Sequence, residues 1–580
     1  MSDSEDDVMA HRKLILISLF ICIFTACTER QQQTETARFD LLITGGRVVD
    51  GSGNPWYRAD IATRDGKIVE IGNLAGRQAE RIIDAADRVV SPGFIDMMGG
   101  STRPLLEDPV SALSKLHQGI TTILVGELTT EAPQNDRTFP EGVEVDGENV
   151  TWRTYEEYFA LLEQREIALN AVHNVGAAQV RSVVLGDEDR APTNAELAEM
   201  KALVAEAMED GVFGLATSLI YPPATYASTE ELIELAKVAA QYNGAYFSHM
   251  RNESHGVLTA LEEAIRIGEQ AGVPVHIYHL KAAGQDNWPL MEAALARIAQ
   301  ARKNGLDITA DVYPYIRNGI GLGSFIHPRH YAQGAADFLP LLSDPEVRQQ
   351  LQREIEETYD WENWYRHVGS NWDNVLIVRA SPEENNVYVG LSIQEAAEES
   401  GVDPWQMFFD LVEQAGGTLQ GVNVSPKSMN EQQKMQALRA PFVAIDTDAS
   451  PVNPSAVDAS HPRAFGTFPR VLAKYVREEG IISLEEAIRK MTSLPANRLR
   501  LFDRGRISPG MSADLVIFDP MKIQDNATFT EPLLYSEGID YSIVNGVMVI
   551  EEGRYTDARP GRLLRASRES ENSSSRTTTP

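Results

Sequence analysis

The chain has 580 residues, more than one ordinary compact core needs, although barrel enzymes with insertions reach this length. Its 43% hydrophobic and 23% charged residues are typical of a globular protein and exclude a disordered or membrane-embedded chain. The formal net charge of −32 argues against nucleic acid as a partner, because an acidic surface repels phosphate backbones.

The first residues have the pattern of a secretory signal. A cationic stretch, His-Arg-Lys at 11–13, precedes the apolar run LILISLFICIF, which is too short to span a bilayer. The residues FTAC at 24–27 resemble a bacterial lipobox, in which Cys27 becomes the lipidated first residue of the mature protein. We therefore expect residues 1–27 to be a lipoprotein signal. The exported protein would touch the periplasmic side of a membrane only through this lipid, and Thr28 favours the outer membrane. A single uncleaved anchor is the alternative.

Cysteine content limits the chemistry of the mature protein. The other cysteine, Cys22, lies within the expected signal. Once the signal is removed, no disulfide can form, and no thiolate is available as a zinc ligand or a nucleophile.

Short strands are expected near both ends of the chain. After a polar linker at 28–39, runs rich in Val and Ile alternate with Gly-containing turns, and similar runs return near the C-terminus. These runs are Leu41–Val49, Asp60–Ile71, Arg81–Val90, Ala513–Phe518 and Tyr541–Ile550. We expect residues 40–91 and 500–562 to form one small β-sandwich, although the sequence does not show that they pair. Residues 563–580, which end in a Ser/Thr-rich stretch, predict a disordered tail.

Between these ends, strand-like runs alternate with amphipathic helices. Helices are expected at Thr193–Gly211, Thr229–Gly244, Val257–Gly272 and Trp288–Gly305, and strands at Val212–Leu219, Ala245–Arg251, Pro274–Ala282 and Asp307–Tyr315. Repeated units of this size predict an α/β fold, a (β/α)8 TIM-like barrel over residues 92–499 with an insertion at about 316–373. An open doubly wound sheet is the alternative, but no glycine-rich phosphate-binding turn follows the first strand.

Polar side chains stand at the ends of the expected barrel strands, where barrel enzymes place their chemistry. They are Glu127, His249, Arg251, His279, Lys281, Asp311, Tyr313 and Asp448. Two histidines, a glutamate and an aspartate at one mouth could hold a divalent, zinc-like ion and an activated water. Histidines after apolar strands are also common as packed core residues, and a glutamate in a loop is often simply solvated.

Several segments resemble the amidohydrolase superfamily, and within it the D-aminoacylase branch. They are VVSPGFID, YFSHMRNE, VPVHIYHLKAAG, ITADVYPY, and AIDTDAS with SHPRAFGTFPRVL downstream, closed by MTSLPANRL and ISPGMSADLVIFDP. The resemblance covers nearly all of Asp40–Asp519. It implies a distorted (β/α)8 barrel, a small β-sandwich made from both chain ends, and hydrolysis of an amide by metal-activated water.

The same resemblance implies roles for individual residues. His249 and His279 match the two histidine ligands of the family. Asp448 matches its catalytic aspartate, which takes a proton from water and delivers it to the leaving nitrogen. The positions that hold the substrate carboxylate or polarise the scissile carbonyl are matched by Arg251, Lys281 and Tyr313.

The departures from the family pattern concern the metal site. Met98 and Gly100 stand where the superfamily has His-X-His, and neither can usefully bind a divalent ion of this kind. The cysteine ligand of the family is also absent, and Glu127 is the nearest group with a ligating oxygen. We therefore expect one divalent ion, Zn²⁺, held by Glu127, His249 and His279, with a water in the fourth position.

These observations predict a metal-dependent hydrolase of a linear C–N amide bond, of the N-acyl-D-amino-acid deacylase type. Its partner is expected to be a small substrate with a carboxylate, bound by Arg251. A cyclic-amide hydrolase or deaminase that uses the same mouth is one alternative. A lipoprotein that keeps the barrel as a non-catalytic ligand-binding module is another, and the missing His-X-His is its main support.

Overall fold

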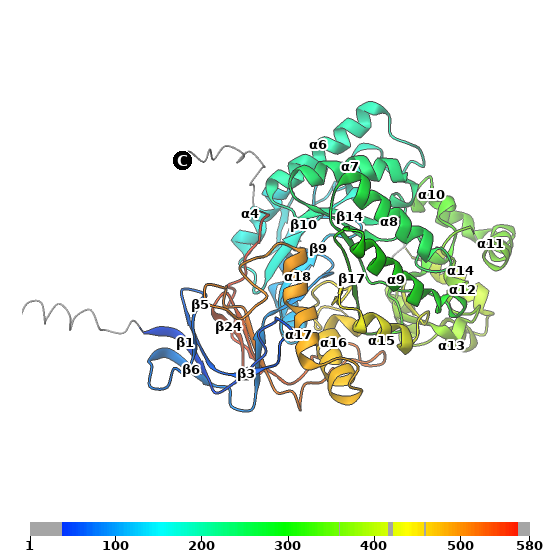
Figure 1. Ribbon diagram of the computed structural model, residues 1–580. Helices are drawn as coiled ribbons and strands as arrows, with labels where there is room; N and C mark the ends of the chain where they lie inside the picture. The colour runs from blue at the N-terminus through cyan, green and yellow to red at the C-terminus, as the bar shows by residue number, and fades with distance from the viewer. Residues whose placement is uncertain (1–37, 359, 416–420, 458–459, 567–580) are drawn as a thin grey trace, which may run out of the picture.

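The computed structural model describes residues 38–358, 360–415, 421–457 and 460–566 (Figure 1). The predicted signal with Cys27 lies outside the described residues, as do most of the linker and residues 567–580. Among the described residues, no helix combines the length and the apolar character needed to cross a membrane.

The middle of the chain forms two parallel sheets that hold nine strands among the described residues. Their orders are β12-β9-β8 and β13-β14-β15-β16-β17-β21, and every pairing within them is parallel. The strands are β8 (Phe94–Asp96), β9 (Ile120–Val125), β12 (Asn170–His173), β13 (Val175–Gly176), β14 (Gly214–Ser218), β15 (Ala245–His249), β16 (Val275–Ile277), β17 (Ile308–Val312) and β21 (Val443–Ile445). Only Asn174 separates β12 from β13, so the chain passes directly from one sheet into the other.

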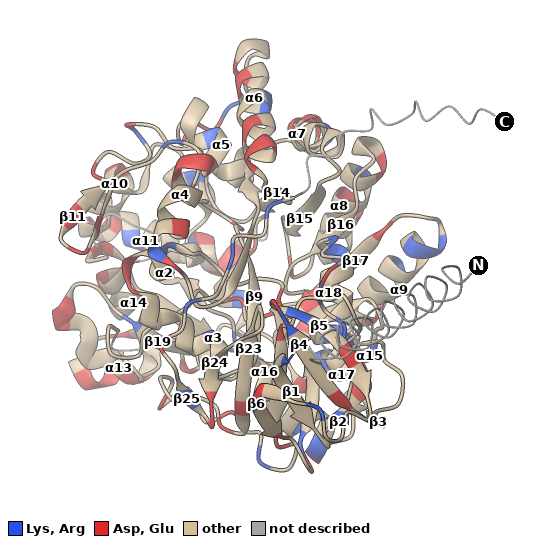
Figure 2. Ribbon diagram, turned by 90° about the vertical axis from the view of Figure 1, so that its left-hand side faces the viewer, with Lys and Arg blue, Asp and Glu red and all other residues tan. Residues whose placement is uncertain are grey.

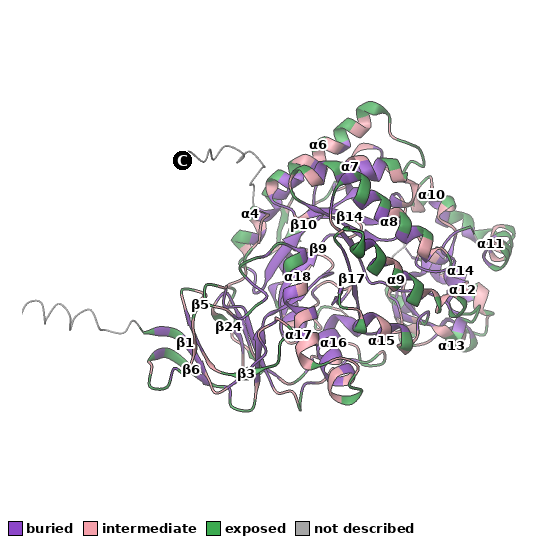
Figure 3. Ribbon diagram, in the orientation of Figure 1, coloured by how far each residue is buried: buried purple, intermediate pink, exposed green. Residues whose placement is uncertain are grey.

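Amphipathic helices cover these strands, as the sequence predicts. They include α5 (Ala177–Val184), α6 (Asn194–Asp210), α7 (Thr229–Gln241), α8 (Val257–Ala271) and α9 (Leu290–Lys303). Thr193 and Glu196 form a capping box at the start of α6, and Gly211 ends that helix in the left-handed conformation. The strands are buried while the outer sides of the helices are exposed (Figure 3). The surplus of 84 Asp and Glu over 52 Lys and Arg is spread over outer helices such as α6 (Figure 2).

Strands from both chain ends share one sheet. A four-stranded sheet has the order β5-β4-β1-β6, and a seven-stranded sheet has the order β25-β24-β23-β22-β7-β2-β3. Their bounds are β1 (Phe39–Thr44), β2 (Arg47–Val48), β3 (Tyr57–Arg58), β4 (Asp60–Arg64), β5 (Lys67–Gly72), β6 (Ala79–Asp84), β7 (Val89–Pro92), β22 (Leu515–Phe518), β23 (Ile539–Val544), β24 (Val547–Glu551) and β25 (Arg554–Tyr555). The antiparallel ladder between β7 and β22 joins the two ends, and one hydrophobic cluster contains residues of both sheets.

The ends of the ordered chain differ slightly from the sequence-based boundaries. Phe39, assigned to the linker, already belongs to β1. Residues 563–566, assigned to the disordered tail, are held by backbone hydrogen bonds, since the Leu564 N–H donates to Ala171 O and the Ala566 N–H to Gly211 O. This stretch contains apolar as well as polar residues, and the apolar ones pack against the hydrophobic core around the parallel strands.

A separate hydrophobic cluster forms beside the parallel strands. It is built from short helices and a small antiparallel sheet, which explains the weak periodicity of this part of the sequence. These elements are β18 (Ile320–Gly321), α10 (Ala335–Phe338), α11 (Pro345–Glu357), α12 (Trp364–His367), β19 (Val375–Arg379), α13 (Ile393–Ser400), α14 (Pro404–Glu413) and β20 (Asn423–Pro426). The cluster contains many buried aromatic residues, among them Phe325, Trp364, Trp372 and Phe408.

Candidate metal centre and active site

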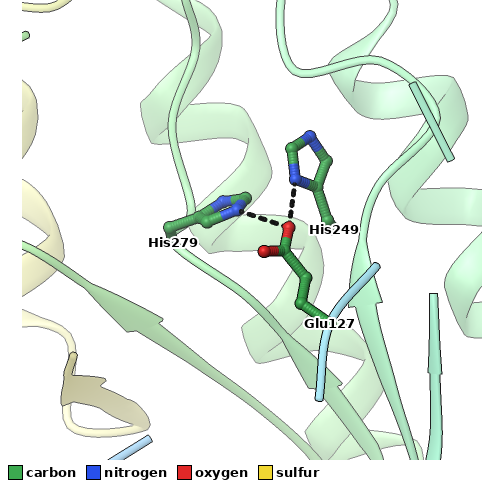
Figure 4. Close-up of side chains that lie close together, drawn as sticks. All are labelled: Glu127, His249 and His279. Carbon is green, nitrogen blue, oxygen red and sulfur yellow. Dashed lines mark hydrogen bonds and ion pairs between the residues drawn. The ribbon is translucent and has the colours of Figure 1, made fainter. Parts of the chain in front are cut away.

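Glu127, His249 and His279 converge at the carboxyl ends of the parallel strands. Glu127 follows β9, His249 ends β15, and His279 lies just beyond β16. Their ligand atoms all lie within 4.8 Å of one another. The two imidazoles approach the same carboxylate oxygen (Figure 4): Glu127 Oε1 lies 2.7 Å from His249 Nδ1 and 3.6 Å from His279 Nε2. The sequence therefore identified three side chains that the fold brings together.

Backbone geometry places Glu127 in this position. Gly126 has a φ of 101°, and a Cβ added there would lie 2.5 Å from Asn174 O. Only glycine fits this close approach, and the resulting turn directs the next side chain toward the histidines. A carboxylate and two imidazoles form an N/O donor set that fits a divalent ion of the zinc type.

Glu253 approaches each candidate histidine ligand at the ring nitrogen that does not face Glu127. Its Oε1 lies 3.0 Å from His279 Nδ1, and its Oε2 lies 3.5 Å from His249 Nε2. Lys281 Nζ lies 2.6 Å from both Glu253 Oε2 and His279 Nδ1. A carboxylate that accepts from the outer nitrogen of a ligating histidine fixes the ring and its tautomer. No role for Glu253 was predicted from the sequence, although this residue stands four positions after His249 in the segment YFSHMRNE.

The charges of the site suit a cation. Burial raises the pKa of Glu127, but hydrogen bonds with His249 and His279 outweigh it and lower that pKa below the usual value. Burial lowers the pKa of His279, but the charge of Glu253 outweighs it and raises that pKa to about 10. The carboxylates therefore stay ionised and supply negative charge to the site, while His279 is protonated in the metal-free protein. A divalent ion bound by His279 would replace that proton.

Asp448 faces the same small cavity. The cavity has a volume of about 60 Å³, and its lining includes Glu127, His249, His279 and Asp448. We predicted that Asp448 closes a strand, but β21 ends at Ile445 and Asp448 lies in the following loop with a φ of 46°. Asp448 is mostly buried, and its Oδ2 accepts from Arg463 Nη1 at 2.5 Å.

A buried clamp holds both neighbours of Asp448. Lys115 Nζ donates to Asp96 Oδ2 at 2.9 Å, to Thr447 Oγ1 at 2.5 Å and to Ala449 O at 2.6 Å. The Thr447 N–H donates to Asp96 Oδ1 at 2.9 Å. Lys115 and Asp96 are fully buried. The clamp explains how a non-glycine residue keeps the left-handed backbone conformation that Asp448 adopts.

The position of Gly100 explains why the His-X-His pair is absent from this site. Gly100 has a φ of 73°, and a Cβ added there would lie 2.3 Å from Ser450 Oγ. A histidine at this position would therefore displace the segment that follows Asp448. Met98 is buried and offers no nitrogen or oxygen from its side chain.

Asp446 and Asp311 form a buried acidic pair that does not line the cavity. Both oxygens of Asp446 are buried without a hydrogen-bond partner among the described residues, and burial together with the charge of Asp311 raises the pKa of Asp446 well above the usual value. Burial raises the pKa of Asp311 to about 7, while its carboxylate accepts from the His279 backbone N–H and from His276 Nε2. Asp446 does not line the cavity. Its role is therefore different from that of Asp448.

The predicted substrate-binding residues divide between two spaces. Lys281 and Tyr313 line the small cavity. Arg251 lies in an adjoining cleft of about 480 Å³, where its Nε donates to Glu263 Oε2 at 2.9 Å. Arg463 was not predicted from the sequence. It pairs with Asp448, and its guanidinium stacks over the Tyr313 ring with the central carbon 4.9 Å from the ring centroid. Its signal was present in the quoted segment SHPRAFGTFPRVL.

Comparison with known proteins agrees with this geometry. The model of the amidohydrolase family matches residues 81–550, and the chain belongs to that family. D-aminoacylase of Alcaligenes xylosoxydans xylosoxydans is 32% identical over 542 residues, which cover 92% of this chain and 99% of the relative. N-acyl-D-glutamate deacylase of the same organism is 32% identical over 531 residues, covering 91% and 97%. Within its family the chain is thus a metal-dependent hydrolase of the D-aminoacylase type, acting on carbon–nitrogen bonds other than peptide bonds.

Solved structures give the same result. N-acyl-D-glutamate deacylase from Bordetella bronchiseptica, complexed with zinc and a phosphonate inhibitor, superposes with a TM-score of 0.75 at 32% identity, covering 91% of this chain and 100% of that chain. A D-aminoacylase structure described by its binuclear metal centre has a TM-score of 0.75 at 31% identity, with the same coverage of both chains. D-hydantoinase from Thermus sp. has a TM-score of 0.53 at 16% identity and supports the fold alone.

Proposed function

We propose that this enzyme removes the acyl group from an N-acyl-D-amino acid at one divalent ion, Zn²⁺, held by Glu127, His249 and His279. The observation that carries the proposal is the convergence of these three ligand atoms beside Asp448 on one small cavity. The relatives include deacylases of N-acyl-D-glutamate and N-acyl-D-aspartate. Such a substrate is small and carries a carboxylate.

The residues of the cavity suit the two proton transfers of amide hydrolysis. When bound, a divalent ion at these ligands polarises the scissile carbonyl as a Lewis acid. Asp448 accepts a proton from the attacking water and delivers it to the leaving nitrogen as the C–N bond breaks. Burial raises the pKa of Tyr313 well above its usual value, so its hydroxyl stays protonated and can donate to the carbonyl oxygen. Lys281 orients His279 and Glu253.

Two arginines are candidates for the substrate carboxylate. Arg463 lies beside Asp448 at the cavity, and Arg251 lies in the adjoining cleft. A guanidinium binds a carboxylate through two parallel hydrogen bonds, which fixes its orientation. Arg251 was the choice from sequence. Both guanidiniums are paired with a carboxylate, Arg251 with Glu263 and Arg463 with Asp448. We propose that Arg463 shares this role because its partner Asp448 lines the small cavity.

A substrate screen with metal analysis tests the proposed function. We expect about one tightly bound divalent ion per chain, because three ligands and a water complete a tetrahedral site. We also expect release of acetate from N-acetyl-D-amino acids, and much slower release from the L-enantiomers. Hydrolysis of hydantoins, or deamination of aminopurines, without any action on N-acyl-D-amino acids would contradict the proposal. So would two equivalents of tightly bound metal.

We also propose the finer architecture that the sequence predicted. Counting β12 and β13 as one, the parallel strands match the eight of a (β/α)8 barrel over 92–499, and the bond from Thr447 to Asp96 Oδ1 supports closure between its last and first strands. The cluster shared by the two end sheets supports a β-sandwich from 40–91 and 500–562.

Export and lipidation at Cys27 are also proposed, on the N-terminal pattern alone. We expect Cys27→Ala to abolish labelling by a radioactive fatty acid in the bacterial host and to release the protein from the outer-membrane fraction. Wild-type protein expressed in parallel provides the control. Membrane association that survives the substitution would favour the uncleaved anchor instead.

A further inference from the structure

The cleft beside the metal centre contains polar groups that the proposed mechanism does not use. It has a volume of about 480 Å³ and shares Tyr221 and Trp364 with the small cavity, so it adjoins the reaction site. Glu362 lines this cleft just before α12 and is only 6% exposed. Neither oxygen of its carboxylate has a hydrogen-bond partner among the described residues.

Two more side chains of the same cleft have buried polar atoms without a hydrogen-bond partner in the part of the chain that the structure describes. They are Trp361, through its indole Nε1, and Ser324, through its hydroxyl Oγ. Buried polar groups are almost always hydrogen-bonded in native proteins, because an unmade bond costs free energy. Three unpaired groups on one cleft wall therefore indicate a surface that is completed by a ligand.

The charges around the cleft favour a cationic ligand. Both arginines of the lining are already paired, Arg251 with Glu263 and Arg329 with Glu354. Burial lowers the pKa of His327, so this imidazole is neutral near pH 7. Burial, with the charge of Glu253, raises the pKa of Glu362 well above its usual value, so a cation bound beside this carboxyl brings it to its ionised form. The lining has two further carboxylates, Asp189 and Asp360. The cleft therefore carries a surplus of negative charge.

Aromatic side chains form much of the remaining wall. They are Tyr221, Tyr226, Tyr331, Trp361 and Trp364. Aromatic faces pack well against methylene groups and attract cations through the ring quadrupole. A chain of methylene groups that ends in a cation matches this combination of aromatic walls and an acidic end.

We propose that Glu362 determines substrate specificity by binding an ammonium or guanidinium group on the side chain of the substrate. The preferred substrates are then N-acyl derivatives of D-lysine, D-ornithine or D-arginine. This inference rests on the proposed deacylase function and names its substrate class. The α-carboxylate and the scissile amide occupy the small cavity, and the side chain extends past Tyr221 and Trp364 into the cleft.

Matched substrates test the inference in the wild-type enzyme. N-acetyl-D-lysine and N-acetyl-D-norleucine both have four carbon atoms in an unbranched side chain and differ in the terminal ammonium. A hydrogen bond to a charged group contributes enough for a preference of about 10- to 100-fold. We therefore expect kcat/KM for the lysine derivative to exceed that for norleucine by this factor. N-acetyl-D-glutamate should be the poorest of the three, because its carboxylate enters a cleft that already contains Asp189 and Asp360.

Variants of Glu362 then assign the preference to this side chain. Glu362→Gln keeps the shape and removes the charge, so kcat/KM for the lysine derivative should fall to near that for norleucine, while norleucine hydrolysis stays unchanged. Glu362→Asp keeps the charge and should restore part of the preference. Glu357→Gln, at an exposed position at the end of α11, is the matched control and should behave as wild type. Thermal melting checks that each variant is folded.

The outcomes separate this inference from the proposed function. If kcat/KM of the wild-type enzyme is equal for the norleucine and lysine derivatives, the specificity role is wrong and the deacylase function stands. Equal loss of both activities in folded Glu362→Gln also overturns the specificity role. If the wild-type enzyme hydrolyses none of the three substrates, nor any other N-acyl-D-amino acid, the proposed function itself is wrong and the inference falls with it.

Discussion

Replacing His279 by alanine should remove bound metal and hydrolysis together. His279 Nε2 faces the shared Glu127 oxygen at 3.6 Å, while its Nδ1 contacts Glu253 at 3.0 Å. The substitution removes one of the three proposed ligands and leaves His249 as the remaining histidine of the small cavity. Mutation of outer-shell partners typically costs about 10- to 100-fold in metal affinity, and loss of a ligand should cost more. Elemental analysis of the purified variant and acetate release from an N-acetyl-D-amino acid measure the two effects.

Other residues of the chain provide graded controls for this result. His330 stacks on Phe338 of the separate hydrophobic cluster and pairs with Glu354 at 2.6 Å, so His330→Ala should retain metal and activity. Glu253→Gln should weaken metal binding by about 10- to 100-fold without abolishing it, as expected for a residue that orients the ligands. A folded His279→Ala variant that retains a full equivalent of metal would show that the ion binds elsewhere.

The ligand positions could be predicted because parallel strands order them. Carboxyl ends of such strands meet at one edge, so polar residues at the strand ends are neighbours even when they are far apart in the chain. Glu127 and His249 are 122 positions apart, yet their side chains are in hydrogen-bond contact. The resemblance to the family selected the same histidines and Asp448 from the other polar residues.

Lys115 and Glu362 could not be predicted, because their roles depend on contacts between segments that are far apart in the sequence. Lys115 reads as an ordinary helix lysine, but it is fully buried and binds the carbonyl oxygen of Ala449, 334 positions later. Glu362 reads as one acidic residue in an aromatic-rich segment, and only its burial beside the cleft distinguishes it. No periodic pattern encodes such contacts. Strand ends were also uncertain, which is why Asp448 was placed within a strand and not in the loop beyond Ile445.

The absence of His-X-His reflects a site built differently on the same fold. Gly100 lies so close to Ser450 that any side chain there would displace the loop carrying Asp448. The Lys115 ammonium lies next to Asp96 and binds the residues on both sides of Asp448. The positive charge of Lys115 thus neutralises the carboxylate of Asp96. The superfamily pattern would place a second pair of metal ligands in this region. This arrangement agrees with one ion and a rigid aspartate.

Asp448→Asn should lower turnover by ~10²–10⁴-fold while metal content and fold persist, because general acid–base groups typically contribute this much. The amide keeps the shape of the side chain but cannot accept the proton of water or return it to the leaving nitrogen. Steady-state kinetics on the best N-acyl-D-amino acid, with elemental analysis and thermal melting of the same sample, measure the effect.

Asp446→Asn is the matched control for Asp448→Asn. Asp446 is two residues earlier, fully buried and absent from the cavity lining, and its two oxygens have no hydrogen-bond partner within the described ranges of the chain. Its raised pKa means that the carboxyl is largely uncharged, and an asparagine there changes the packed acidic pair with Asp311 more than it changes the reaction. We therefore expect Asp446→Asn to affect thermal stability more than rate. If Asp448→Asn retains near wild-type turnover, or if Asp446→Asn shows the larger loss of rate with metal still bound, the proton transfer belongs to another residue.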